Sequence, residues 1–230
     1  MTEVTVRIVH DFICPWCFIG QKNMQSIAST WADKYKISVE FSSYFLNEKI
    51  PRETGMSAEK YVEEKYGKSA KSNSKPSDLF KMAEDADIFL PKTYHNGSRT
   101  IYHSGRAHLL EKYASQKLED SAKLWNLVTD IYSAYHIENR NIDSEEVLLS
   151  IASNYDLPEE EVRNAINDEA ELEQTYKESD RNKEIEVGVP QFYFYKNGKE
   201  VVNQISGKYN LKSVYQDCFI NKMKQLNNGY

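Results

Sequence analysis

Two cysteines separated by two residues, Cys14 and Cys17, are the side chains whose type and spacing most directly suggest chemistry. The thiolate is the attacking species in thiol–disulfide exchange, and a free cysteine, with a pKa of about 8.5, is only slightly ionised at neutral pH. The spacing allows the second thiol to close a small disulfide ring with the first, so the pair predicts an attacking and a resolving thiol. Taken alone, the motif also fits half of a zinc site completed by His10 or Cys218, or two inert buried thiols.

The residues around the motif predict a strand that leads into a helix. Val4 to His10 alternate as in a strand, with both faces buried near its end. Pro15 suits the first position of a helix. Cys14 is therefore expected at the helix N-cap, exposed, where free N–H groups and the helix dipole favour an anion. Cys17 is expected one turn further in and more shielded, so this context favours redox chemistry over a zinc site.

The same helix should continue well beyond the cysteines and lead to a second strand. Its apolar face is marked at intervals of three, four, seven and eleven residues by Met24, Ile27, Ala28, Trp31 and Tyr35. Alternation from Lys36 to Phe45 predicts a second strand, parallel to the first and joined to it by a right-handed crossover. A mostly helical stretch follows.

The last part of the sequence returns to strand patterns. Its predicted features are a strand at 191–195, an Asn197-Gly198 hairpin turn, a return strand at 201–205 and a closing helix at 211–226. The order is therefore strand–helix–strand, a set of helices, then strand–strand–helix. We predict an α/β domain formed by residues 1–48 and 184–230, into which a helical domain of residues 49–183 is inserted.

A proline precedes the first strand of this last part. Gly188-Val189-Pro190 leads directly into it. Proline at a strand entrance lacks an N–H and often marks a turn or a cis bond. On its own, the tripeptide is most simply a loop that leads into a strand.

Composition limits the classes of function. The 230 residues are 40% hydrophobic and 28% charged, which is typical of a globular protein. The net charge of −6 and the scattered basic residues predict no nucleic-acid partner. No apolar run is long enough to span a bilayer, and the N-terminal residues lack the layout of a signal peptide. Three cysteines do not form the framework of a disulfide-stapled secreted domain, so we expect a cytoplasmic protein with no membrane partner.

Several other side chains are weaker candidates. His10 and Asp11 end the first strand beside the motif, where either could shuttle a proton during exchange or simply cap the strand end. His103 and His108 are five residues apart, a poor match to one helix face, so no metal is expected there, and His108 should pack near the domain interface. We expect Cys218 to be a buried, inert thiol.

Taken together, these segments resemble a known family. The matching stretches are Asp11-Phe12-Ile13-Cys14-Pro15-Trp16-Cys17-Phe18-Ile19-Gly20, Arg106-Ala107-His108, Gly188-Val189-Pro190 and Ile205-Ser206-Gly207. Along nearly the whole chain the sequence is similar to the DsbA family of thioredoxin-fold proteins, and within it to the FrnE-like branch grouped with 2-hydroxychromene-2-carboxylate isomerase-type proteins. The resemblance implies an α/β thioredoxin-like fold with a large inserted α-helical domain.

The resemblance also implies roles for individual residues. Cys14 would be the nucleophile and Cys17 the resolving thiol. Pro190 would be cis, with Val189 facing the cysteines and its backbone available to pair with an extended substrate. Trp16, between the cysteines, is expected to shape substrate access.

The resemblance leaves two functions to compare. The isomerase and kappa-class glutathione transferase relatives usually carry serine in place of the first cysteine, whereas this chain keeps both. A thiol–disulfide oxidoreductase acting on protein or small-thiol substrates is therefore favoured over a glutathione-dependent transferase or isomerase. No cofactor is expected beyond the Cys14–Cys17 disulfide itself, although glutathione could be a co-substrate. The sequence leaves the redox direction open, and either a monomer or a homodimer fits.

Overall fold

The computed structural model describes residues 1–67, 76–95, 99–186, 188–196, 199–200, 205–206 and 221. The strands are β1 (Thr2–His10), β2 (Tyr35–Ser43), β3 (Met56–Ser57), β4 (Thr100–Ile101), β5 (Gln191–Lys196), β6 (Lys199–Glu200) and β7 (Ile205–Ser206). The α-helices are α1 (Pro15–Thr30), α2 (Ala58–Tyr66), α3 (Pro76–Asp85), α4 (Gly105–Lys117), α5 (Ser121–His136), α6 (Glu145–Ala152), α7 (Glu159–Ile166) and α8 (Glu169–Ile185). Two short 3-10 helices span Lys92–His95 and Ser153–Tyr155.

The central sheet is built on β1. Its strand order is β2-β1-β5-β6, with β7 also paired to β5. β2 runs parallel to β1, and β5 runs antiparallel to it with Gln191 opposite Val9. Val4, Val6, Ile8 and His10 are buried on one face, while Val9 is buried on the other face near the strand end. The predicted β1–α1–β2 unit is confirmed.

Helix α1 begins and ends for local reasons. Cys14 is the N-cap with an extended backbone, and Pro15 is the first helical residue. The apolar face continues through Met24 and Ile27, both buried. The prediction was wrong in carrying that face to Tyr35, because the helix ends at Thr30 and a turn leads to Tyr35, the first residue of β2.

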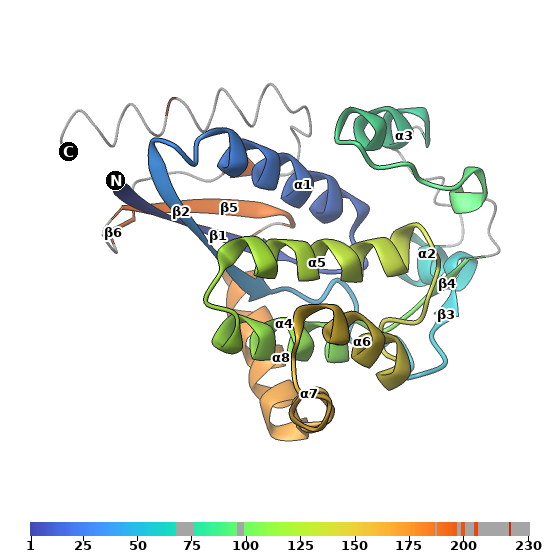
Figure 1. Ribbon diagram of the computed structural model, residues 1–230. Helices are drawn as coiled ribbons and strands as arrows, with labels where there is room; N and C mark the ends of the chain where they lie inside the picture. Colours follow the sequence, from blue (N-terminus) through green and yellow to red (C-terminus); the bar gives the residue numbers. More distant parts are fainter. Residues whose placement is uncertain are drawn as a thin grey trace.

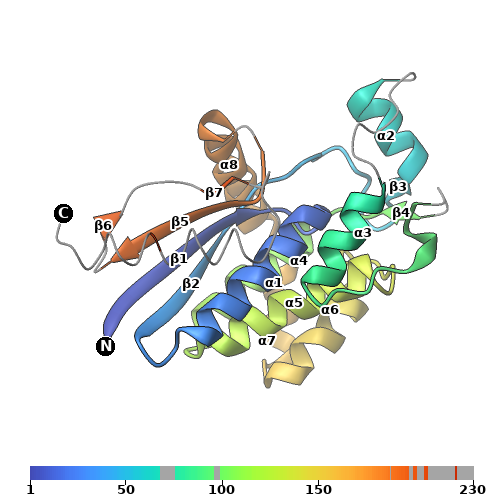
Figure 2. The same ribbon diagram turned by 90° about the horizontal axis from the view of Figure 1, so that it is seen from above.

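The helices α2 to α8 fall between β2 and β5 in the sequence. In Figure 1, α4 to α8 gather below the sheet, whereas α2, α3 and the β3–β4 pair lie at the end of the molecule away from the labelled N-terminus. The first turn of α1 points toward that same end, and Figure 2 shows the same arrangement from above. The two-residue strands β3 and β4, which pair antiparallel, were not predicted because they are too short to show a pattern.

Some predictions concern segments beyond these elements. The Asn197-Gly198 turn, most of the return strand, the closing helix and Cys218 lie outside the described residues. The domain boundaries at 48/49 and 183/184 stay a prediction. In the part of the chain that the structure describes, no helix combines the length and the apolar character needed to cross a membrane.

Candidate active site

The two cysteines lie at the start of α1, as free thiols. A turn precedes the helix, in which the Cys14 N–H donates to the carbonyl of Asp11 at 3.1 Å. The Cys14 carbonyl then accepts from the Cys17 N–H at 3.1 Å, which starts the helical hydrogen bonding. The two side chains are thus one turn apart, as predicted. Cys14 was expected to be exposed and is not, since only 5% of its surface is accessible, against 0% for Cys17.

The surroundings of the two sulfurs push their pKa values apart. A hydrogen bond from the Cys17 thiol, supported by the backbone N–H groups of Cys17 and Trp16, lowers the pKa of Cys14, against burial and the charge of Asp11. Burial, and then the interaction with Cys14, raises the pKa of Cys17 well above its ordinary value. Cys14 is therefore the more readily ionised thiol of the pair and Cys17 the thiol that keeps its proton, which is the division that disulfide exchange needs.

Val189 and Pro190 reach the cysteines from the other end of the sequence. Because β5 runs antiparallel to β1 and Gln191 pairs with Val9, the residues just before β5 lie beside the loop that follows β1. The Val189–Pro190 bond is cis, and the Val189 carbonyl oxygen lies 3.8 Å from the Cys14 sulfur. The structure therefore brings together Cys14, Cys17 and Val189-Pro190, the three parts that the sequence named.

The remaining residues named from the sequence lie close by. Trp16, on the first turn of α1, is partly buried and packs against the core. Asp11 is 1% exposed, and its carboxylate accepts the N–H of Ile13 at 3.3 Å and that of Leu46 at 2.7 Å. Burial alone would raise the pKa of Asp11, but His108 and the Leu46 N–H outweigh burial and lower it. Asp11 is therefore a buried carboxylate that stays ionised.

The side chain of His10 is buried in the core, where both of its ring nitrogens have partners. Its Nδ1 lies 2.7 Å from the Tyr132 hydroxyl and its Nε2 lies 2.8 Å from Oε2 of Glu111. Burial lowers the pKa of His10, although Glu111 opposes that effect. A neutral ring satisfies both contacts when Nε2–H donates to Glu111 and Nδ1 accepts from Tyr132. Because both ring nitrogens have partners in the core, His10 does not complete a zinc site with the cysteines.

Helix α4 contributes two buried charged groups that the sequence analysis did not recognise as part of the site. His108 and Glu111 are three residues apart and therefore share a helix face. Nε2 of His108 lies 3.7 Å from Oδ1 of Asp11, and its Nδ1 lies 3.7 Å from Oε2 of Glu111. The i, i+3 spacing of a histidine and a carboxylate was a usable signal. The contact with Asp11, which no local pattern reveals, makes the pair part of this site.

Opposing effects set the charges of this pair. Burial disfavours the protonated ring of His108, but the two carboxylates outweigh burial and raise its pKa to about 9. Burial also disfavours the charged form of Glu111 and would raise its pKa. His10 and His108 outweigh burial and lower that pKa to about 2. Asp11, His108, Glu111, His10 and Tyr132 form a continuous set of polar side chains, which we call the polar cluster.

Three members of the polar cluster have the side-chain types of metal ligands. The ligand atoms of His10, His108 and Glu111 lie within 4.8 Å of one another, and among the described residues no group of three includes a cysteine. Two ligands on one tetrahedral zinc ion are about 3.3 Å apart, given metal–ligand bonds of about 2.0–2.1 Å. The 2.8 Å between His10 and Glu111 is instead the distance of a formed hydrogen bond. The contact between His10 and Glu111 is therefore a hydrogen bond from a neutral ring to a carboxylate, which fits this arrangement better than a metal site.

A further buried histidine, His136, approaches the motif from α5. Its Nε2 lies 2.9 Å from the Phe12 carbonyl oxygen and its Nδ1 lies 2.6 Å from the Tyr94 hydroxyl. Burial, reinforced by Arg99, lowers the pKa of His136 well below its usual range. His136 therefore fixes the backbone just before the cysteines as a neutral ring. Lys65 of α2 interacts electrostatically with both Cys14 and Asp11, and its Nζ lies 3.2 Å from the Tyr61 hydroxyl.

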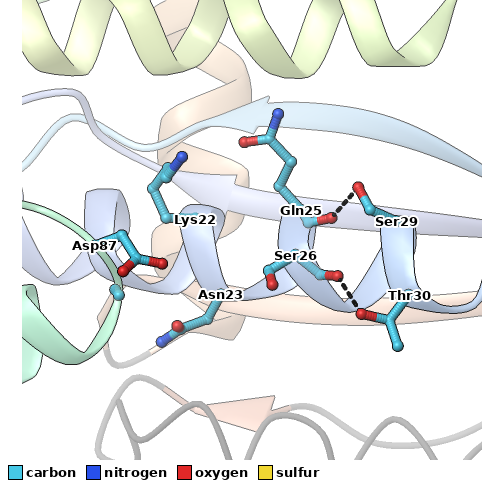
Figure 3. Close-up of a pocket in the computed structure, with 8 residues that line it drawn as sticks. Lys22, Asn23, Gln25, Ser26, Ser29, Thr30 and Asp87 are labelled. Carbon is cyan, nitrogen blue, oxygen red and sulfur yellow. Dashed lines mark hydrogen bonds between the residues drawn. The ribbon is translucent and has the colours of Figure 1, made fainter.

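A polar hollow of about 510 Å³ lies elsewhere on α1. Its lining comes from the later turns of that helix and from the turn after α3, as Figure 3 shows with Lys22, Asn23, Gln25, Ser26, Ser29, Thr30 and Asp87. The hydroxyls of Ser29 and Thr30 donate to helix carbonyls at 3.0 and 2.8 Å. Neither cysteine lines this hollow, so its size does not make it the reactive site.

Comparison with known proteins agrees with the fold. The family model described as DSBA-like thioredoxin domain matches residues 5–216, and the chain belongs to this family. Its thioredoxin-like DsbA fold, with helices inserted between β2 and β5, is the predicted fold. No curated protein matches the sequence.

Solved structures share the fold at low sequence identity. A probable DsbA oxidoreductase from Streptomyces coelicolor is 18% identical with a TM-score of 0.74, covering 96% of this chain and 90% of that one. The cytosolic disulfide reductase DsbM from Pseudomonas aeruginosa is 19% identical with a TM-score of 0.67, covering 96% and 99%, and a structure of it with GSH also matches. A 2-hydroxychromene-2-carboxylate isomerase is 14% identical with a TM-score of 0.65, covering 97% and 98%. At these identities the likeness shows the fold alone.

Proposed function

We propose that this protein is a thiol–disulfide oxidoreductase that exchanges disulfides through Cys14 and Cys17. The observation that carries the proposal is the division of the pair, in which Cys14 at the helix N-cap has a lowered pKa and Cys17 a strongly raised one. Membership of the DSBA-like thioredoxin family supports it.

The reductive half of the cycle uses both sulfurs in turn. The Cys14 thiolate attacks one sulfur of a substrate disulfide, the substrate S–S bond breaks, and the other substrate sulfur leaves as a thiolate. Cys17 then gives up its proton and attacks Cys14, which releases the second substrate thiolate and leaves the Cys14–Cys17 disulfide. The oxidative direction is the reverse, with a substrate dithiol losing two electrons to that disulfide. The Val189 backbone next to Cys14 could align an extended substrate in either direction.

The proposed substrates are proteins or small thiols, with glutathione as a co-substrate. A cytosolic disulfide reductase with the same fold has been solved with GSH. That structure supports a small thiol as a substrate of this protein, and the location of the reductase supports a cytoplasmic location for it. His10 and Asp11 are the proposed proton shuttle of the site. In this role Asp11 exchanges a proton with the Cys17 thiol. Trp16 would border the entrance to Cys14.

Two serine variants test the proposal. Cys14→Ser should abolish disulfide reduction, measured with insulin and with glutathione disulfide, and should form no mixed disulfide. Cys17→Ser, the matched control, should lose turnover yet accumulate a stable mixed disulfide at Cys14, visible by mass spectrometry. Unchanged turnover in Cys14→Ser would refute the proposal. Thioether formation with glutathione retained in that variant would favour the transferase or isomerase alternative.

A further inference from the structure

We propose that His108 is a positioning residue for disulfide exchange, held as a buried cation by Asp11 and Glu111, and that its charge allows Cys14 to remain a thiolate. This inference rests on the proposed function. It assigns roles to two residues of α4 that lie outside the cysteine motif.

The two carboxylates on either side of His108 favour a proton on both of its nitrogens. The ring is 0% exposed, and each nitrogen faces a carboxylate oxygen at 3.7 Å without reaching hydrogen-bond distance of any acceptor. A neutral imidazole would turn one lone pair toward one of these carboxylates, which is unfavourable in a buried site. A protonated ring presents an N–H to each carboxylate. The neutral rings of His10 and His136, by contrast, each pair one nitrogen with a tyrosine hydroxyl.

The cysteines need such a cation because Asp11 is a negative charge beside them. Its carboxylate raises the pKa values of both Cys14 and Cys17. Two anions, Asp11 and the Cys14 thiolate, then share a buried region where Coulomb forces are weakly screened. Without a nearby positive charge, one of these two anions would take up a proton. His108 is the cation that faces Asp11 directly, so its charge lowers the free energy of the state in which both are ionised.

Glu111 keeps the charge on His108. It is 2% exposed, and its Oε2 faces His108 on one side and accepts from His10 on the other. Two other titratable groups act on the ring, namely His10 of β1, whose ring lies 5.1 Å away, and His103 of the loop before α4, which interacts with it electrostatically. Tyr132 of α5 is linked to them through His10, because its hydroxyl lies 2.7 Å from Nδ1 of His10. Burial keeps His10, Tyr132 and His103 uncharged at neutral pH, so the two carboxylates decide the charge of His108.

A consequence for the redox potential follows from this arrangement. Stabilising the Cys14 thiolate stabilises the reduced form of the pair, which makes the disulfide a stronger oxidant. Removing the cation should therefore raise the pKa of Cys14 and make the pair more reducing.

The test is a pH titration of thiolate absorbance near 240 nm on the reduced protein. His108→Gln should raise the pKa of Cys14 by about one pH unit, which is a tenfold loss of thiolate below that pKa. Glu111→Gln should give a smaller rise, because the cation weakens but Asp11 still attracts it. His136→Gln, the matched control, removes an equally buried but uncharged histidine, and it should shift the pKa of Cys14 by less than His108→Gln does, because no charge is lost.

Two further measurements separate a charge effect from a general disturbance. Equilibration with glutathione buffers should show a tenfold change of the equilibrium constant in His108→Gln, equivalent to about 30 mV for two electrons. Its disulfide reduction rate should be low at neutral pH and recover as the pH is raised, which a misfolded site would not do. Imidazole ¹⁵N NMR on the wild type needs no variant and should show His108 doubly protonated at pH 7.5.

The inference is overturned if His108 is neutral at that pH, or if folded His108→Gln and Glu111→Gln both titrate like the wild type. Neither result depends on turnover. Failure of this inference is therefore distinguishable from failure of the proposed function, which the Cys14→Ser variant decides.

Discussion

Two histidines, His108 and His136, contact the same residue before the cysteine motif and carry different charges. The ring of His108 lies 5.0 Å from that of Phe12, and Nε2 of His136 lies 2.9 Å from the Phe12 carbonyl oxygen. They are equally buried, 0% and 1% exposed. The pKa of His108 is nevertheless raised to about 9, whereas that of His136 is lowered well below its usual range.

The difference lies in the partners, because burial acts on both rings in the same direction. Two carboxylates flank His108. A carbonyl and a hydroxyl pair with His136, and Arg99 opposes a second positive charge there. On the His108 side of the motif, ion pairs stabilise the structure. On the His136 side, hydrogen bonds of a neutral ring and stacked rings do so, such as Phe18 on His136 with ring centroids 5.7 Å apart. Variants on the two sides should therefore differ in size of effect and in pH dependence.

The largest effect is expected from Glu111→Ala. Removing this buried carboxylate leaves the His108 cation with one partner and the His10 N–H with none, which typically costs about 3–5 kcal/mol of unfolding free energy. Urea denaturation at pH 7 measures it. Glu161 also joins two side chains, Lys117 and Tyr113, but at the surface, and its alanine variant should change stability little. Equal losses of unfolding free energy in Glu111→Ala and Glu161→Ala would contradict the distinction between buried and exposed carboxylates.

The pH dependence of stability should separate the two histidines. The pKa of His108 is about 9 in the folded protein and about 6.5 in the unfolded chain. Its contribution is therefore fully present below pH ~6.5 and is lost as the pH rises through 9, and it amounts to roughly 3 kcal/mol. The difference in unfolding free energy between the wild type and His108→Gln should shrink by that amount across this window. The disulfide forms should be compared, so that Cys14 and Cys17 do not titrate.

His136→Gln should behave in the opposite way in the same experiment. Because the folded pKa of His136 lies below the unfolded value, the unfolded wild type alone gains a proton below pH ~6.5. The advantage of the wild type over His136→Gln should therefore fall as the pH is lowered and stay constant between pH 7 and 9. A constant difference for His108→Gln over that alkaline range would show that His108 is not charged in the folded protein.

The smallest effects should come from the tyrosines that donate to neutral histidines. Tyr132→Phe and Tyr94→Phe each remove a hydroxyl next to a ring nitrogen of His10 or His136, at 2.7 and 2.6 Å. Each should cost about 1–2 kcal/mol, measured by thermal or urea unfolding, because a buried nitrogen loses its partner while the aromatic ring remains. Neither loss should vary between pH 7 and 9. A pH-dependent loss in Tyr132→Phe alone would show that His10 also carries charge.

Much of the reactive centre could be predicted because its signals are local. The alternation of β1, the proline after Cys14 and the cysteine spacing each act within a few residues, and together they place Cys14 at the N-cap of α1. The polar cluster could not be predicted in the same way. His10 and Glu111 are 101 residues apart, so their hydrogen bond has no counterpart in any local pattern. His108 was expected near the domain interface with no role, although its spacing from Glu111 was visible.

The sequence by itself determined the strand–helix junction, the order of the two thiols and the proline before β5, because backbone sterics and helix capping depend on neighbouring residues. Only the tertiary structure decided that Cys14 is buried and that Val189 lies against its sulfur. It also decided that a pair of carboxylates encloses His108 while an arginine lies near His136. The physical reason is that burial and Coulomb interactions act through space, between side chains that the fold brings together from distant parts of the chain.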